Sequence, residues 1–458
     1  MDTSKVFIRP PLISFCCDFS LVLGFPRSPH IDYILGGVEI ISNGSGSHHQ
    51  LRKLESRLNL IKNATSSGGG IYMYSNHRGC DGGRLYFDGC SMICVNGDIV
   101  AQASQFSLKS VEVITAVVDI IDVRNFRGAM GSFQEQASAQ PPQVPVINLS
   151  SFSLSHSGLS YKPVSRPVPP RIHTPEEECA LGPACWLWDY LRRSGASGYL
   201  LPLSGGADSA AVATIVYVMS CLAVTELEKG NEEVQKDVRR IINRNVSVGE
   251  GKDTHADLPK TGAELCAAML HTIYMGTVNS SSTTEKRARK LATQIGCYHL
   301  SFRFDAVVNA ITTLFASVTG HVPNFQIRGG TRGEDLALQN IQARIRMVVA
   351  YLFAQLLPWV RSLGSGGGGS GGGFLLVLGS SNVDEALRGY FTKYDCSSAD
   401  IAPIGGICKQ DLKRMLLWAA GYYGIDALSE ITHAVPTVRR DRLLLSCRIL
   451  SCLVLSAS

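Results

Sequence analysis

The sequence predicts an α/β protein with two differently built domains. From about residue 176, strand-length apolar runs alternate with segments of helical periodicity, which is typical of a parallel sheet with crossover helices. Residues 36–125 instead carry short β-rich runs separated by turns, and a proline-rich stretch divides the two patterns. With 458 residues, 45% of them apolar, the chain is long enough for two or three domains.

These patterns predict the individual elements. In the first half, the candidate strands are 37–41, 70–74, 91–95 and 111–115. The dipeptide Asn96-Gly97 follows the third of them and predicts a tight hairpin to a further strand at 98–100. In the second half, the candidate strands are 199–203, 270–275, 298–302 and 374–378, and the candidate helices are 184–194, 208–222, 284–295, 304–318 and 336–356.

Composition sets the expected domain boundaries. Residues 364–373 consist only of glycine and serine, which predicts a flexible insert before the last strand. After residue 437 the chain becomes an Arg/Leu/Ser/Cys run without turn residues. The expected division is 1–22 unassigned, 23–136 first domain, 137–175 linker, 176–437 second domain and 438–458 an aberrant tail.

Charge and cysteine content argue against several classes of protein. A net charge of +5 without a dense Lys/Arg stripe argues against nucleic-acid binding. Fourteen cysteines without metal-binding spacing fit reduced thiols in the cytoplasm better than a disulfide framework. The sequence shows no apolar run of about 18 residues and no convincing signal peptide, so we expect no membrane span.

The most informative motif is the hexapeptide Ser204-Gly205-Gly206-Ala207-Asp208-Ser209. It lies between an apolar strand and an apolar helix, where glycines let a loop close on phosphate oxygens. The first helical amides and the serine hydroxyls donate to such oxygens. Asp208 beside phosphates indicates a bridging Mg²⁺, since carboxylate and phosphate repel each other. The alternative is an ordinary Gly-Ser turn. The loop is not a Walker loop, because no Gly-Lys-Ser/Thr follows.

The hexapeptide resembles the SGGxDS loop of ATP pyrophosphatases, which cleave ATP between its α- and β-phosphates to adenylate a substrate. Three later segments, together with Lys409, resemble NAD synthetases more specifically. The segments are 340–347 (NIQARIRM), 379–385 (GSSNVDE) and 389–401 (GYFTKYDCSSADI). Within the third, Phe391–Asp400 is the most specific part of the resemblance.

The resemblance implies a role for each matching residue. ATP binding is implied for Ser204, Gly205, Gly206, Ala207, Asp208, Ser209, Ser380 and Lys409, among which Ser204 and Asp208 are the implied catalytic residues. Asp208 and Glu385 are implied as ligands of Mg²⁺. Arg344, Lys393 and Asp400 are implied to bind the dinucleotide substrate.

The implied reaction is the ATP-dependent amidation of nicotinic acid adenine dinucleotide to NAD. The substrate carboxylate attacks the α-phosphate of ATP to give an acyl adenylate and pyrophosphate, and ammonia then displaces AMP. Two anions must approach each other, so the site needs Mg²⁺ and lysines. In the family the ammonia comes from glutamine. We also expect a homo-oligomer, with the helix 336–356 in its interface.

Residues 24–136 resemble the C-terminal part of the nitrilase-type glutaminase domain of glutamine-dependent NAD synthetases, plant members above all. The matching segments are 28–30 (SPH), 44–53 (GSGSHHQLRK), 79–86 (GCDGGRLY) and 105–108 (QFSL). The implied fold is a partial nitrilase-like α/β/β/α domain followed by a Rossmann-like ATP pyrophosphatase domain. Ser20 stands where the family has its nucleophilic cysteine, so we expect glutaminase activity to be lost and the chain to be truncated at both ends.

Two alternatives stay open at this point. Another ATP pyrophosphatase, such as a GMP synthetase or a tRNA thiolation enzyme, would share the first loop but not the Phe391–Asp400 segment. An inactive paralogue or a truncated gene-model product would share the ancestry without the activity.

Overall fold

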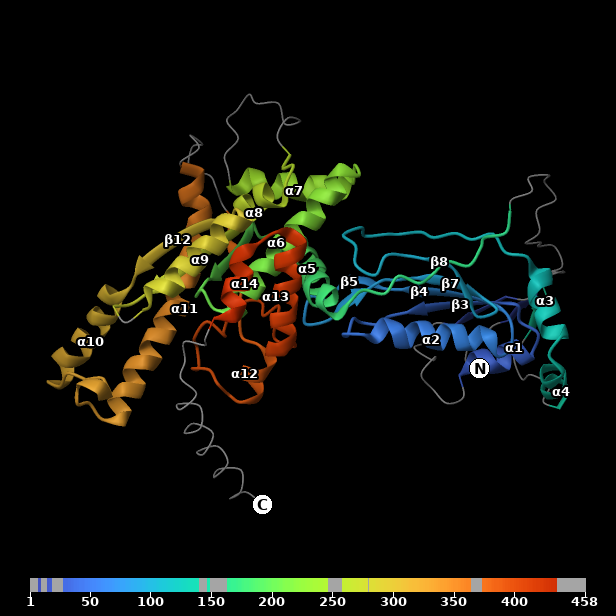
Figure 1. Ribbon diagram of the computed structural model, residues 1–458, viewed down its shortest axis with the longest axis horizontal. Helices are drawn as coiled ribbons and strands as arrows, with labels where there is room; N and C mark the ends of the chain where they lie inside the picture. Colours follow the sequence, from blue (N-terminus) through green and yellow to red (C-terminus); the bar gives the residue numbers. More distant parts are fainter. Residues whose placement is uncertain are drawn as a thin grey trace, which may run out of the picture. The chain divides into compact units, whose positions relative to one another are not determined.

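The structure is a computed structural model that divides into two compact units, Met1–Glu178 and Cys179–Ser458 (Figure 1). It describes residues 7–9, 15–18, 28–139, 146–148, 163–245, 258–278, 280–363 and 373–434. Ser20, the expected tail and all of the expected glycine-rich insert except Gly373 lie outside these ranges. The boundaries expected for the insert and the tail therefore stay predictions.

The first unit is built on a seven-stranded sheet of order β8-β7-β4-β3-β2-β1-β9. The strands are β1 (Phe7–Arg9), β2 (Phe15–Asp18), β3 (Ile40–Ser45), β4 (Ile71–Asn76), β7 (Met92–Val95), β8 (Asp98–Gln102) and β9 (Val146–Asn148). β3 is parallel to β2 and β4, whereas β7 and β8 form an antiparallel edge. β1 and β2 lie in the segment expected to be unassigned, and β9, in the expected linker, pairs with β1. A separate ribbon joins β5 (Arg78–Cys80) to β6 (Tyr86–Asp88).

Helices α1 (Pro29–Leu35) and α2 (Lys53–Ser66) pack on this sheet, and α2 runs along its strands in Figure 1. Alternate residues of β7 are buried, as expected for a sheet with one well-covered face. The core beneath the two helices contains Tyr33, Ile34, Leu54, Leu58, Ile61, Tyr72, Tyr74, Met92, Cys94 and Ile99. Two further helices follow, α3 (Ile120–Gly128) and α4 (Gly131–Ala139).

The turns of the first unit test two of the predicted elements. The hairpin at Asn96-Gly97 is confirmed, because both residues have positive φ, 50° and 97°, and connect β7 to β8. The strand expected at 111–115 is wrong, since this segment forms an irregular loop. Its Val113 is 80% exposed, and the loop is held by an ion pair of 2.6 Å between Glu112 and Arg78. Among the described residues, no strand pairs with this segment despite its apolar alternation.

The second unit contains a parallel sheet of order β12-β11-β10-β13. Its strands, β10 (Gly198–Pro202), β11 (Leu270–Gly276), β12 (Tyr298–Arg303) and β13 (Leu375–Val377), confirm all four predicted ones. The chain proceeds outward from β10 to β12 and then returns to the other side of β10 for β13. The strand order thus reverses between β10 and β13. In open α/β sheets the ligand crevice lies at such a switch point, at the carboxyl ends of the strands.

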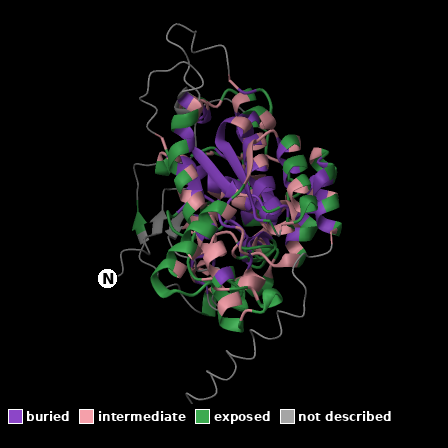
Figure 2. Cartoon of the chain, turned by 90° about the vertical axis from the view of Figure 1, so that its left-hand side faces the viewer, coloured by how far each residue is buried: buried purple, intermediate pink, exposed green. Residues whose placement is uncertain are grey.

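Helices cover both faces of this sheet, and Figure 2 shows the buried strands between them. All seven residues of β11 are buried, as a strand covered on both faces requires. The helices from α5 onward are α5 (Pro175–Ser194), α6 (Ala207–Glu228), α7 (Glu232–Asn245), α8 (Gly262–Met269), α9 (Ser282–Ile295), α10 (Asp305–Thr319), α11 (Arg332–Leu363), α12 (Val383–Leu387), α13 (Lys409–Tyr423) and α14 (Asp426–His433), and not all of them touch the sheet. On one face, α11 contributes Ile345, Ala354 and Leu357 to a core with strand residues Leu200 and Ile273.

Two helices of the described part of the chain are long and apolar enough to cross a membrane, judged by length and composition alone. They are Ala207–Glu228, whose apolar window is 72% buried, and Arg332–Ser362, whose window is 28% buried. A buried core helix passes the same test, so these helices are weak evidence for a membrane span. The expectation of no membrane span stays a prediction.

Candidate functional site

The predicted phosphate loop lies at the carboxyl end of β10 and leads into α6, whose N-cap residue is Gly206. Gly205 has a φ of 77°, and a Cβ at this position would lie 2.2 Å from the carbonyl oxygen of Thr284. Only glycine fits such a position. The loop therefore packs directly against the first turn of α9.

Hydroxyl groups organise the inside of this loop. Ser204 Oγ lies 3.0 Å from Ser209 Oγ, and the amide of Gly206 donates to Ser204 Oγ at 3.3 Å. Ser209 is buried, whereas Ser204 and Gly206 are exposed. The first amides of α6 point out of the helix at this end, which is the arrangement that binds anions.

Three segments distant in sequence meet at Asp208. The Asn382 amide nitrogen donates to Asp208 Oδ1 at 2.9 Å, and Lys409 Nζ lies 3.2 Å from Asp208 Oδ2. The backbone amide of Lys409 donates to Asp384 at 2.8 Å, which fixes the start of α13 beside α12. The structure thus places Asp208 and Lys409 together at the switch point, and their implied roles in ATP binding stay predictions.

Glu385, the second implied Mg²⁺ ligand, lies in α12 close to Asp208. Burial, and then the nearby Asp208 carboxylate, raise the pKa of Glu385 above its usual value. Two carboxylates in one place favour a cation between them. No group of three or more His, Cys, Asp or Glu side chains among the described residues forms a metal site. The pair still fits Mg²⁺, which typically takes one or two protein carboxylates and completes its coordination with phosphate oxygens and water.

Ser380 lies in the loop that follows β13. Its neighbour Gly379 donates its amide to the carbonyl of Ile401 at 2.8 Å. Leu378 and Ile401 also form a parallel β-bridge, so the end of the 389–401 segment lies beside the end of β13. This bridge brings the residues implied to bind the dinucleotide to the same edge of the sheet as the phosphate loop.

The three residues implied to bind the dinucleotide all lie on α11 or the 389–401 segment. Arg344 Nε donates to the carbonyl of Lys393 at 3.0 Å, so these two residues are adjacent. Asp400 accepts from the amide of Val377 at 2.8 Å and from the Tyr351 hydroxyl at 3.0 Å. Asp400 therefore also anchors the segment to β13 and α11.

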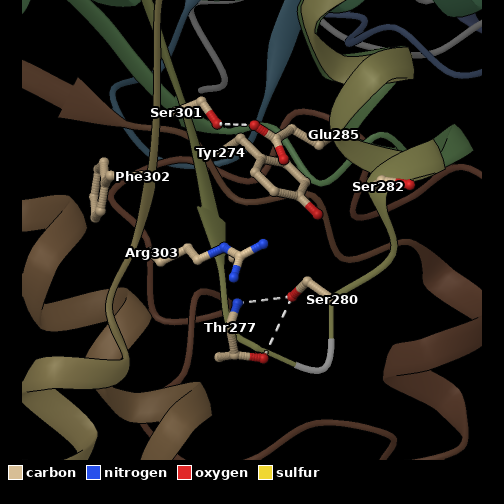
Figure 3. A pocket seen from close by; sticks show the side chains of 9 residues that line it. Tyr274, Thr277, Ser280, Ser282, Glu285, Ser301, Phe302 and Arg303 are labelled. Carbon is tan, nitrogen blue, oxygen red and sulfur yellow. Dashed lines mark hydrogen bonds between the residues drawn. The ribbon is translucent and has the colours of Figure 1, made fainter.

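A pocket of about 210 Å³ opens at the carboxyl ends of β11 and β12 (Figure 3). Its lining is Tyr274, Gly276, Thr277, Ser280, Ser282, Glu285, Ser301, Phe302 and Arg303. Ser301 Oγ donates to Glu285 at 2.7 Å, and the side chain of Arg303 extends between the two strands and Ser280 in Figure 3. The Tyr274 hydroxyl lies 3.0 Å from Thr284 Oγ1. Because Thr284 is also the residue beside Gly205, the pocket adjoins the phosphate loop.

Sequence reasoning missed this pocket, Asn382 and Tyr351. A signal for Asn382 was present, because an Asn three residues before a Glu is a typical helix start. The contact from Asn382 to Asp208 depends on the pairing of β10 with β13, which no local pattern reveals.

Two family profiles match the chain. Residues 183–421 match the family described as NAD synthase, and residues 23–127 match the family described as carbon-nitrogen hydrolase. Similar curated proteins are glutamine-dependent NAD(+) synthetases. That of Oryza sativa subsp. indica is 52% identical over 95% of this chain and 56% of its own length. That of Homo sapiens is 50% identical over 91% of this chain and 56% of its own length. The chain spans about half the length of the curated relatives it matches.

Solved structures agree with the fold. A glutamine-dependent NAD(+) synthetase from Cytophaga hutchinsonii has a TM-score of 0.66 at 21% identity, covering 94% of this chain and 60% of that one. One from Acinetobacter baumannii in complex with ADP has a TM-score of 0.59 at 17% identity, covering 94% and 61%. At this identity the similarity shows the fold alone, and it agrees with the two domains that the family matches give.

Proposed function

Because the chain belongs to the NAD synthase family, we propose that its second unit converts nicotinic acid adenine dinucleotide to NAD with ATP and ammonia. The observation that carries this proposal is the meeting of Asp208, Lys409 and α12 at the switch point of the sheet. A phosphate loop, a lysine and two carboxylates are the parts that adenylation of a carboxylate needs.

In this proposal each part of the site has one task. The loop from Ser204 to Ser209 binds the phosphates of ATP through its hydroxyls and the first amides of α6. The ammonium group of Lys409 stabilises the negative charge of the departing pyrophosphate. The pocket beside Thr284 accommodates the adenosine part. Asp208 and Glu385 would hold Mg²⁺, which neutralises phosphate charge when bound.

The dinucleotide would bind beside α11. Arg344 and Lys393 supply positive charge for its phosphates and carboxylate, while Asp400 keeps the segment that carries Lys393 against β13. This arrangement would bring the substrate carboxylate toward the α-phosphate without water between them, which favours attack.

The source of ammonia is a separate part of the proposal. The first unit matches the carbon-nitrogen hydrolase family, so it is related to the part that would release ammonia from glutamine. Loss of that activity was expected from Ser20, which lies outside the described residues. The comparisons give this loss no support, and it stays a prediction.

We also propose that the chain self-associates through α10 and α11. These helices expose Val307, Ile311, Leu314, Phe315, Val318, Leu336, Val348, Leu352, Leu356 and Trp359. Exposed apolar side chains gathered on two neighbouring helices are typical of an interface. Light scattering should show that Leu352→Glu lowers the molar mass, whereas Leu417→Glu, at a comparably exposed leucine of α13, leaves it unchanged.

The test of the proposed activity is NAD formation from nicotinic acid adenine dinucleotide, ATP and Mg²⁺, with ammonium or glutamine as nitrogen donor. We expect NAD and pyrophosphate in equal amounts with ammonium. Asp208→Ala should abolish both. Asp426→Ala changes an exposed aspartate in the first turn of another helix and should leave them unchanged. A folded wild-type chain that forms neither product would refute the proposal and favour the inactive relative.

A further inference from the structure

Asn382 is a polar side chain that is completely buried at the switch point, with 0% exposed. It occupies the N-cap position of α12. Its Oδ1 accepts from the backbone amide of Glu385 at 3.0 Å, and its Nδ2 donates to Asp208 Oδ1 at 2.9 Å. A backbone amide only donates and a carboxylate only accepts, so both ends of the Asn382 amide have matching partners.

These two bonds join the loops that carry the implied metal ligands. Asp208 belongs to the loop after β10, and Glu385 belongs to the helix after β13. With Asp208 Oδ1 taken by Asn382, only Oδ2 faces Lys409. A buried donor to an ionised acceptor makes a strong hydrogen bond. Asn382 therefore fixes the rotation of one carboxylate and the backbone that carries the other.

We propose that Asn382 is a positioning residue for nucleotide-bound Mg²⁺. It acts by holding Asp208 and Glu385 at fixed positions relative to each other across the switch point. This inference rests on the proposed function, since it concerns the cation that ATP brings to the site. Preorganised ligands bind more tightly because less freedom is lost on binding. Losing Asn382 should weaken Mg²⁺-dependent ATP binding, while ATP binding without the metal changes little.

The test separates the two hydrogen bonds of Asn382. Asn382→Ser and Asn382→Thr keep an oxygen that caps α12 but are too short to donate to Asp208. Thr261→Ala serves as the matched control. The Thr261 side chain caps α8 by accepting a hydrogen bond from the backbone amide of Glu264, and alanine removes this cap. Calorimetry measures the dissociation constant of ATP with and without Mg²⁺, and Mn²⁺ spin resonance in the presence of ATP reports metal binding directly.

We expect both Asn382 variants to lose about tenfold in ATP affinity with Mg²⁺ and less than about twofold without it. Thr261→Ala should lower the melting temperature and leave both constants unchanged. If either folded Asn382 variant keeps the wild-type difference between the two dissociation constants, the positioning role is refuted.

If both Asn382 variants fail to fold, Asp208→Asn in the same calorimetry should still remove the Mg²⁺-dependent gain in ATP affinity. An unchanged gain would overturn the inference. A wild-type chain that binds no ATP would refute the proposed function itself.

Discussion

Replacing Gly205 by alanine tests whether the phosphate loop is held against α9 as the structure shows. The backbone of Gly205 has a φ of 77°, which strains an alanine by about 1–2 kcal/mol. The added Cβ would also lie 2.2 Å from the carbonyl oxygen of Thr284, so the loop must move away from α9. Overpacking of this kind destabilises by about 1–3 kcal/mol. The sum predicts a loss of about 2–5 kcal/mol in the free energy of unfolding.

Two other glycines separate the causes of this loss. Gly230 has a φ of 75° with nothing within 4 Å, so Gly230→Ala measures the backbone strain alone, about 1–2 kcal/mol. Gly206 follows Gly205 directly, has no positive φ, and its added Cβ would meet Ser204 Oγ at 3.4 Å. Gly206 is also the N-cap of α6, where alanine is a poorer cap than glycine, so Gly206→Ala should cost no more than about 1 kcal/mol.

Chemical unfolding followed by circular dichroism measures these stabilities, and NAD formation measures the effect on the site. A shift of the loop by about 1 Å should lower the rate of Gly205→Ala by about a hundredfold. The reasoning is wrong if Gly205→Ala is no less stable than Gly230→Ala and forms NAD at the wild-type rate.

Three further predictions concern side chains outside the phosphate loop. Tyr351→Phe removes the hydroxyl that donates to Asp400 and should raise the Michaelis constant for the dinucleotide about tenfold, with ATP affinity unchanged as the check. Burial lowers the pKa of His271 to about 3, so stability should fall as pH decreases below about 6.5, and melting curves of His271→Phe should show a flatter dependence. Arg57→Met removes the ion-pair partner, at 3.0 Å, of the buried Asp88 carboxylate and should destabilise the first unit by about 3–5 kcal/mol. Adding Asp88→Asn should restore part of that loss, and a double variant no more stable than the single one would contradict the account.

In the second half of the fold, β10 was predictable because a buried parallel strand is a nearly continuous apolar run. The less buried β12 instead alternates apolar and polar residues. β10, β11 and β12 appear within one or two residues of the predicted ranges. The first unit was harder, since the amphipathic helix α2 has a weak periodicity and was missed. β9 was also missed, because it is short and lies among prolines.

The candidate site divides in the same way. The phosphate loop could be predicted because Ser204 to Asp208 are consecutive and their residue types carry the chemistry. Asn382 could be read only as a helix cap. Its second hydrogen bond, to Asp208, joins the loops after two neighbouring strands and depends on the pairing of β13 with β10. Local sequence patterns predict elements, while contacts between loops follow from strand order.

The strand order also has a consequence for how the chain is synthesised. Asp208 and Lys409 are 201 residues apart, so at about 5–20 residues per second a ribosome makes the second about 10–40 s after the first. Until β13 has been synthesised, one edge of β10 lacks its final partner. Tyr199 and Leu200 of β10, which are fully buried in the folded protein, lie at this unpaired edge. An unpaired apolar edge can add strands from other chains. The nascent protein would therefore be most prone to aggregation during this interval, when a chaperone would be most useful to it.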